Sequence, residues 1–295
     1  MKIKFWGVRG SIACPGPKTL KYGGNTSCIE IRSDDNDLII LDAGTGIFQL
    51  AQTLFPELPL TCHIFITHTH WDHIQGLPFF IPSFIPGNNL NIYGAFDPVE
   101  QRGISSILAR QLEYSYFPVR EEELKATTKY VTLAEHQTVQ AGSAKVTNIF
   151  MNHPVLNFGY KIECNGKTVF FTGDHEELYN LYAPEDEDYH KYEKFMTQKN
   201  KAILDFVRGV DVLIADTSYT RDDYPAKQGW GHGTFDGNMR LAKEAGVKTM
   251  FFTHHEPTRD DANLEKVFQE ALDRHPRKPG DPEYLLAQEG LEFEL

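Results

Sequence analysis

Cysteine is scarce in this chain: four occur in 295 residues, and none stands in a CxxC pair. Zinc held through sulfur and a framework of disulfide bonds are therefore not expected. Apolar runs are short as well, so no stretch reaches membrane-spanning length and the first residues do not look like a secretory signal. These absences predict a chain of the reducing cytoplasm with no membrane partner.

Positive charge is also in short supply. Twenty-nine lysines and arginines stand against 41 aspartates and glutamates, which gives a formal net charge of −12. A protein that holds many phosphates in a row normally presents a basic stripe, so extended nucleic acid is not expected as a partner. A small anionic substrate stays open, because a metal ion would supply its own positive charge.

The rest of the composition is typical of a globular protein with a large core, with 41% apolar and 24% charged residues. Strands, glycine turns and helices alternate as in a layered α/β domain, and we expect one domain over residues 1–295. The strongest hairpin pattern is Asn165-Gly166 between two apolar runs. Expected strands lie at 2–6, 28–31, 38–41, 62–67, 90–93, 145–151, 158–164, 168–171, 212–215 and 248–253, and expected helices at 47–54, 104–112 and 192–208, from Thr234 to Ala245, and from Asp260 or Asp261 onward.

One short stretch carries most of the chemistry, Thr67-His68-Thr69-His70-Trp71-Asp72-His73. Three histidines and a carboxylate fall within six residues, directly after an expected strand. Imidazole and carboxylate together suit zinc, manganese or iron better than calcium or magnesium. A histidine-rich polar loop or a solvated helix start is the alternative, and the density of ligands favours a metal site. Zinc is the default metal.

Three further segments place metal-ligand residue types at the ends of expected strands. His153 and Asp174 each follow a strand, and each is weak evidence by itself. The last apolar strand ends in His254-His255, and strand alternation sends these neighbours to opposite faces, so either one is a candidate. The turn from Asp42 to Gly46 either caps the next helix or forms a floor beneath the metals.

Two histidines and one aromatic patch have roles that the residues leave open. His232, in a glycine loop, either acts on a substrate phosphate or caps the following helix. His175 either supports the metal ligands from behind or is exposed. The aromatic patch Tyr114 to Phe117 is expected to belong to the core or to a subunit interface, which would be a homodimer contact. The alternative is a wall on which a base or another ring stacks.

Taken together, these motifs resemble the metallo-β-lactamase superfamily over nearly the whole chain. The pattern His68-x-His70-x-Asp72-His73 is highly specific for it. The resemblance implies a single-domain, four-layer αββα sandwich with two divalent metal ions at one edge. It implies that the first metal is held by His68, His70 and His153 and the second by Asp72, His73 and His254, with Asp174 bridging the two.

Other residues indicate which subgroup of the superfamily the chain resembles most. Asp174 in place of cysteine departs from true β-lactamases, and His70 departs from the flavin-linked di-iron oxidoreductases, where a glutamate is expected. The motif 231–234 is similar to the phosphodiesterase side of the superfamily, which includes ribonuclease Z and cyclic-nucleotide phosphodiesterases, and there the histidine matching His232 acts on the phosphate. Gly233 stands where serine is commoner, which puts a hydroxyl contact in doubt. Segments 5–11 and 23–27 look like a bacterial hydrolase subgroup, and from them Asn25 and Thr26 are expected substrate contacts.

We therefore expect a binuclear metal-dependent hydrolase, most simply a phosphodiesterase of small phosphodiesters such as cyclic nucleotides. A metal-bridging hydroxide would attack phosphorus, with Asp72 and His232 as the catalytic side chains. A tRNA 3′-processing endonuclease should carry a basic RNA-gripping arm, which the sequence does not offer. A lactone or thioester hydrolase should not need His232. A non-catalytic binding protein is disfavoured by the complete ligand set.

Overall fold

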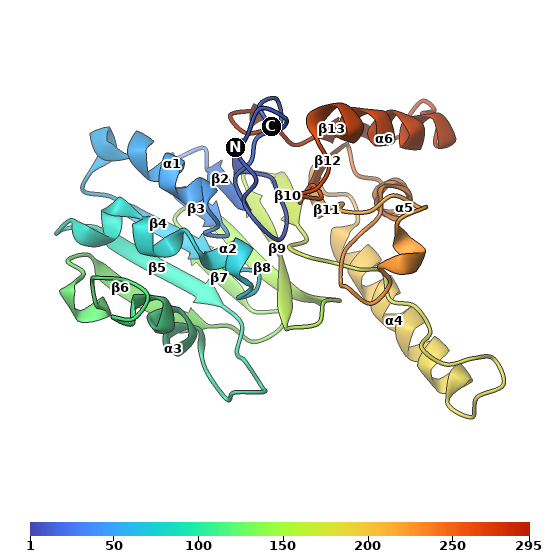
Figure 1. Cartoon of the computed structure of the whole chain (residues 1–295), viewed down its shortest axis with the longest axis horizontal. Helices are drawn as coiled ribbons and strands as arrows, with labels where there is room; N and C mark the ends of the chain where they lie inside the picture. The colour runs from blue at the N-terminus through green and yellow to red at the C-terminus, as the bar shows by residue number, and fades with distance from the viewer.

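The computed structural model describes residues 1–295 and folds them into two seven-stranded sheets (Figure 1). The first sheet contains β1 (Lys2–Gly7), β2 (Cys28–Arg32), β3 (Leu38–Leu41), β4 (Thr61–Phe65), β5 (Asn89–Gly94), β6 (Thr127–Thr132) and β14 (Glu292–Glu294), in the order β14-β1-β2-β3-β4-β5-β6. The second contains β7 (Thr138–Ala141), β8 (Ala144–Met151), β9 (Asn157–Cys164), β10 (Lys167–Phe171), β11 (Val212–Asp216), β12 (Thr249–Thr253) and β13 (Glu283–Leu286), in the order β13-β12-β11-β10-β9-β8-β7.

Helices cover the outer face of each sheet. On the first sheet lie α1 (Gly46–Thr53), α2 (Trp71–Ile74) and α3 (Ile104–Ala109), and on the second α4 (Tyr189–Val207), α5 (Phe235–Ala245) and α6 (Asp261–Arg274). Figure 1 shows the two sets on opposite sides, with α4 projecting from the body.

Three clusters of buried apolar side chains lie between these layers. One holds side chains of both sheets, such as Phe5, Phe65, Phe171 and Phe251. The other two join the first sheet to α1 and α3 and the second sheet to α4, α5 and α6. The expected four-layer αββα sandwich is confirmed.

Parallel pairing brings the polar strand ends to one edge. In the first sheet β3, β4, β5 and β6 are parallel neighbours, and in the second β10, β11, β12 and β13 are. Because parallel strands end at the same edge of their sheet, the loops after β3 and β4 gather at one edge of the first sheet, and those after β10, β11 and β12 at one edge of the second. These two edges lie side by side.

Several local features follow the expectations, although four strands, β6, β7, β13 and β14, were not among those expected. The hairpin turn Asn165-Gly166 has φ of +50° and +76°, as a type I′ turn requires. Asp260 rather than Asp261 caps α6, its side chain accepting from the Asn263 amide at 2.8 Å. The expected helix 104–112 ends at Ala109, and Arg110–Leu112 continue as a 3₁₀ turn.

The aromatic patch is not part of the core. Tyr114 and Tyr116 are 74% and 71% exposed, so that part of the expectation is wrong, and the homodimer contact there stays a prediction. No helix has the length and apolar character needed to cross a membrane.

Candidate metal centre

The seven expected metal ligands meet at the shared edge of the two sheets. The loop after β4 and the start of α2 supply four of them, and the ends of β8, β10 and β12 supply the others. His153, Asp174 and His254 are far apart in the chain and adjacent in space. The ligands fall into two groups that share Asp174, and within each group the donor atoms lie within 4.8 Å of one another.

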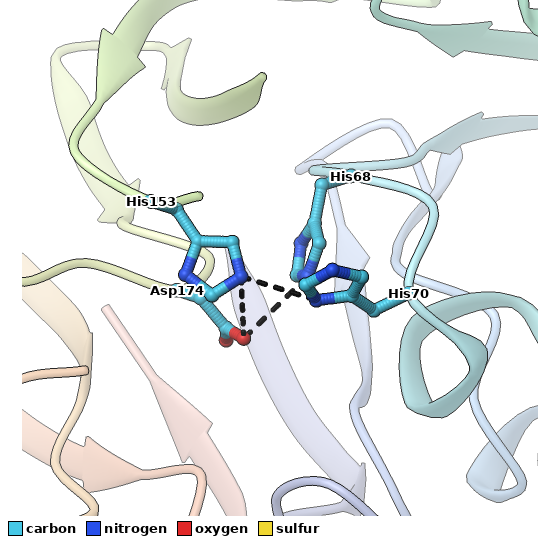
Figure 2. Close-up of side chains that lie close together, drawn as sticks. All are labelled: His68, His70, His153 and Asp174. Atoms are coloured by element: carbon cyan, nitrogen blue, oxygen red, sulfur yellow. Dashed lines mark hydrogen bonds and ion pairs between the residues drawn. The ribbon is translucent and has the colours of Figure 1, made fainter. Parts of the chain in front are cut away.

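The first group contains His68, His70, His153 and Asp174 (Figure 2). His153 Nε2 lies 3.1 Å from His70 Nδ1 and 3.8 Å from Asp174 Oδ2. His68 Nε2 lies 3.5 Å from the same carboxylate oxygen. Three imidazole nitrogens and one carboxylate oxygen thus point at a common space, as a four-coordinate metal requires.

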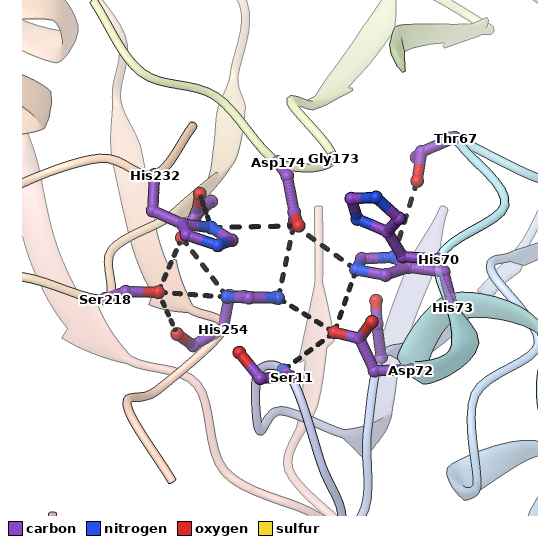
Figure 3. Close-up of polar contacts among 12 residues, drawn as sticks. Ser11, Thr67, His70, Asp72, His73, Gly173, Asp174, Ser218, His232 and His254 are labelled. Atoms are coloured by element: carbon purple, nitrogen blue, oxygen red, sulfur yellow. Dashed lines mark hydrogen bonds and ion pairs between the residues drawn. The ribbon is translucent and has the colours of Figure 1, made fainter. Parts of the chain in front are cut away.

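The second group contains Asp72, His73, His254 and Asp174 (Figure 3). Asp72 Oδ2 lies 3.3 Å from His73 Nε2 and 3.2 Å from His254 Nε2. Asp174 Oδ1 is 3.3 Å and 3.2 Å from the same two nitrogens. Asp174 therefore turns Oδ2 to the first group and Oδ1 to the second, which is the geometry of a bridging carboxylate.

The hydrogen bonding of these side chains fits two divalent cations. His68 Nε2, His73 Nε2 and Asp174 Oδ1 are buried and have no hydrogen-bond partner. Buried polar atoms are almost always paired, and the cost of leaving them unpaired is high. Because all three atoms face the shared space, metal ions there would satisfy them.

Burial also sets the protonation of the first group. It lowers the pKa of His68 well below the ordinary value and that of His153 to about 4. Both rings are then neutral near pH 7, which is the form that binds a metal. Burial opposes ionisation of Asp174, but neighbouring histidines, His254 first among them, outweigh it and hold its pKa low.

A buried aspartate supports the second group from the first sheet. Asp42 Oδ2 accepts from His73 Nδ1 at 2.7 Å, and Asp42 Oδ1 accepts from the Thr67 amide at 2.8 Å. Thr45, at the N-cap position of α1, makes no side-chain capping bond. The turn after β3 is therefore the floor beneath the centre and not a helix cap.

A second buried aspartate, Asp216, was not among the expected site residues. Its Oδ2 lies 3.0 Å from His232 Nδ1, and its Oδ1 lies 3.4 Å from His254 Nδ1. Ser218 Oγ, also unforeseen, lies 2.9 Å from His254 Nδ1. Asp216 ends a fully apolar strand, and an acidic residue at such a strand end, as also at Asp174, was the pattern that could have identified it.

His232 lies beside the centre and does not cap α5. The cap is Thr234, whose Oγ1 accepts from the Gly237 amide at 3.0 Å. The His232 side chain is 12% exposed, and its Nδ1 lies 3.7 Å from Asp174 Oδ2. Burial lowers the pKa of His232, but Asp216 and Asp174 outweigh burial and raise it above the ordinary value.

The structure decides between the adjacent histidines after β12. His254 points into the centre, with a left-handed backbone at φ +58°. His255 points away, and its Nε2 donates to the Ala287 carbonyl at 2.9 Å. His175 is buried rather than exposed, and its Nδ1 accepts from the Asn152 amide, next to His153, at 3.1 Å.

The two expected substrate contacts bind the protein itself. The side-chain amide of Asn25 donates to Glu289 at 2.9 Å, and Thr26 is fully buried, its Oγ1 accepting from the Thr45 amide at 2.9 Å. These bonds tie segment 23–27 to the C-terminal segment and to α1. The structure gives both residues a role in holding these segments together, and their contact with substrate stays a prediction.

Comparison with known proteins gives a consistent picture. The protein-family model described as "Beta-lactamase superfamily domain" matches residues 38–255 of this chain. Ribonuclease Z of Staphylococcus haemolyticus is 23% identical over 303 residues, covering 92% of this chain and 93% of that protein. The metallo-β-lactamase fold protein YhfI of Bacillus subtilis superposes with a TM-score of 0.67 at 21% identity over 99% of both chains. Unliganded yeast PDE1 does so with a TM-score of 0.64 at 15% identity, over 100% of this chain and 99% of that one.

Proposed function

This chain belongs to the β-lactamase superfamily of metal-dependent hydrolases, and from this premise we propose that it is a phosphodiesterase of small phosphodiesters, with a cyclic nucleotide as the favoured substrate. The metals in this proposal are two divalent ions, zinc first, with manganese or iron as alternatives. The proposed ligands are those of the two groups, and Asp174 bridges them. The proposed catalytic side chains are Asp72 and His232.

The placement of His232 carries the proposal. Asp216 fixes its ring at the edge of the ligand cluster, and the same ring borders a cavity of about 770 Å³ between α4 and α5. Lys201 and Tyr224 are among the residues that line this cavity. The cavity has the size of a small-molecule site, and His232 is its link to the centre, because none of the seven candidate metal ligands lines it.

The chemistry follows from that placement. When bound, two metals would lower the pKa of a water molecule and neutralise the oxygens of an in-line displacement. His232 then supplies a proton to the leaving alkoxide or balances the charge of the phosphate. Asp174 joins the two groups, Asp72 supplies a carboxylate to the second, and Asp216 keeps the His232 ring turned toward them.

The net charge and one acidic segment favour a small substrate over RNA. The formal net charge is −12, and the segment Glu185 to Asp188 is acidic and exposed, whereas the projecting helix α4 that follows it carries four lysines against one glutamate and one aspartate. The acidic segment repels a phosphate backbone.

A tRNA 3′-processing endonuclease is the second candidate. The observation in its favour is that the relative from Staphylococcus haemolyticus is named Ribonuclease Z and aligns over 92% of this chain. It would use the same metal ligands.

Turnover of four substrates tests the proposal: bis(p-nitrophenyl) phosphate, 3′,5′-cyclic AMP, a precursor tRNA with a 3′ trailer, and a neutral lactone. His232→Ala would be compared with His136→Ala, which removes an exposed histidine. We expect the first substitution to reduce phosphodiester turnover by roughly 10²-fold to 10⁴-fold with both metals retained, and the second to change nothing. Turnover of the precursor tRNA alone supports the second candidate, and turnover of the lactone alone contradicts both.

A further inference from the structure

Glu176 is a buried acidic residue that neither the metal ligands nor the proposed chemistry uses. It lies two residues after Asp174 and is 2% exposed. Its two carboxyl oxygens accept from the Gly229 amide at 2.9 and 3.1 Å, and Oε2 also accepts from the Gly231 amide at 2.9 Å. Tyr224 Oη donates to Oε1 at 2.7 Å. One side chain thus holds the loop 224–231, which leads directly into His232.

The backbone of Glu176 is tied to the other side of the centre. Its amide donates to the Asn152 carbonyl at 3.0 Å, and Asn152 Nδ2 donates to the Glu176 carbonyl at 3.0 Å. Asn152 directly precedes the expected ligand His153. Glu176 therefore joins two segments that are remote in sequence, each of which carries a histidine of the site.

The loop that Glu176 holds makes a direct contact with His153. His153 Nδ1 donates to the Gly231 carbonyl at 2.9 Å. Gly231 has φ +86°, and a Cβ there would come within 2.3 Å of His153 Nδ1, so only glycine permits this approach. Because a carbonyl only accepts, the bond keeps the proton on Nδ1 and leaves Nε2 free to face Asp174 and a metal.

We propose that Glu176 is a positioning residue for the metal held by His68, His70 and His153. It fixes the loop whose Gly231 carbonyl orients the His153 ring. The second metal group has its own supports, Asp42 and Ser218, and no hydrogen bond joins Asp72, His73 or His254 to the loop 224–231. Loss of Glu176 therefore weakens one metal site and spares the other. The inference rests on the proposed metal ligands and not on the identity of the substrate.

Glu177 supplies a matched control. It carries the same charge one residue later, its side chain is 57% exposed, and it pairs with Arg240 at the surface. Glu177→Ala removes an identical charge without reaching the loop 224–231. Glu176→Gln is the conservative variant, because its amide keeps one acceptor oxygen for the loop and loses the other.

The test measures metal affinity in full-length protein without substrate. Metal-free protein would be titrated with Zn²⁺ against a competing chelator, and bound metal counted by elemental analysis. For Glu176→Ala we expect a loss of about 10-fold to 100-fold in affinity at one of two sites, with the other unchanged. The Zn²⁺ affinity of Glu176→Gln should lie between those of Glu176→Ala and the unsubstituted protein. The affinity of Glu177→Ala should match that of the unsubstituted protein.

Equal weakening of both sites, or full affinity at both, overturns the proposal. Thermal unfolding of the metal-free variants shows whether they fold. If Glu176→Ala does not fold, Glu176→Gln decides, and unchanged affinity in that variant overturns the proposal. An unsubstituted protein that binds fewer than two metals overturns the ligand assignment itself, and this inference with it. Phosphodiester turnover has no bearing on either outcome.

Discussion

Two buried aspartates stand behind the metal centre, one at the end of a strand in each sheet. Asp42 follows β3, and its bonds reach Ser27, Thr67 and His73, all within the first 73 residues. Asp216 ends β11, and its side chain accepts from the His175 and Gly233 amides and lies against the rings of His232 and His254. Both carboxylates are buried, but Asp42 contacts partners close to it in the sequence, whereas Asp216 contacts partners from several separate segments.

The difference shows how each half of the centre is built. Asp42 supports a compact unit in which one loop supplies His68, His70, Asp72 and His73. Asp216 joins the ends of three neighbouring strands, β10, β11 and β12, with the loop before α5. We infer that Asp42 chiefly supports metal binding and Asp216 chiefly supports the placement of His232. Three substitutions test this contrast, and a fourth measures the stability of α5, the helix that follows the His232 loop.

Asp174→Ala should have the largest effect, because this residue belongs to both halves. Removing the shared carboxylate should lower bound metal from two ions toward none and reduce turnover by on the order of 10³-fold, about 4 kcal/mol in the activation free energy. Metal content and kcat/KM would be measured beside Asp188→Ala, an exposed carboxylate. Retention of both metals by Asp174→Ala would contradict the bridging role.

Asp216→Asn should reduce turnover of phosphodiesters by roughly 10²-fold while both metals stay bound. The asparagine keeps the shape and one acceptor oxygen but removes the negative charge that raises the pKa of His232, whereas His254 keeps its contact with Ser218. The measurements are kcat at saturating metal and the metal count. If Asp216→Asn bound less metal but kept its kcat, Asp216 would act like Asp42.

Asp42→Asn should weaken binding of the metal in the Asp72, His73 and His254 group by about 10-fold to 100-fold, because His73 loses its charged acceptor. Activity should return when metal is added in excess, in contrast to Asp216→Asn. A titration of activity against Zn²⁺ checks this. A loss of kcat that excess metal does not restore would remove the distinction between the two aspartates.

Thr234→Ala should have the smallest effect. Loss of the N-cap of α5 should cost about 1 kcal/mol in the free energy of unfolding, which lowers the Tm by roughly 2–4 °C. Thr53→Ala, at an exposed helix position that caps nothing, is the control. Thermal unfolding measures both, and equal stability of the two variants would show that Thr234 is not an effective cap.

Much of the fold, and the clustering of the candidate metal ligands, could be predicted from the sequence. The strands were recognisable from short apolar runs bounded by turn residues, and the helices from apolar positions spaced three and four apart. His68, His70, Asp72 and His73 were recognisable because they share one loop. The choice of His254 over His255 came only from the resemblance, since strand alternation made both reasonable.

The supporting residues could not be predicted in the same way. For Asp216 the sequence offered only its place at the end of an apolar strand. Ser218 and Glu176 act through partners remote in sequence, and such pairs have no period that a sequence pattern reveals. The same holds for Asn25 and Thr26. The resemblance predicted that they contact substrate, and only the structure showed their hydrogen bonds to Glu289 and Thr45.

By itself, the sequence determined the layered α/β architecture and the four candidate metal ligands of one loop, His68, His70, Asp72 and His73, because local periodicity and one compact motif encode them. The tertiary structure decided which oxygen of Asp174 faces which group and which aspartate stands behind which histidine. It also decided that the Glu176 side chain closes onto the loop before His232. Those outcomes depend on strand ends brought together by the packing of two sheets, and the distances that define them exist only once the chain has folded.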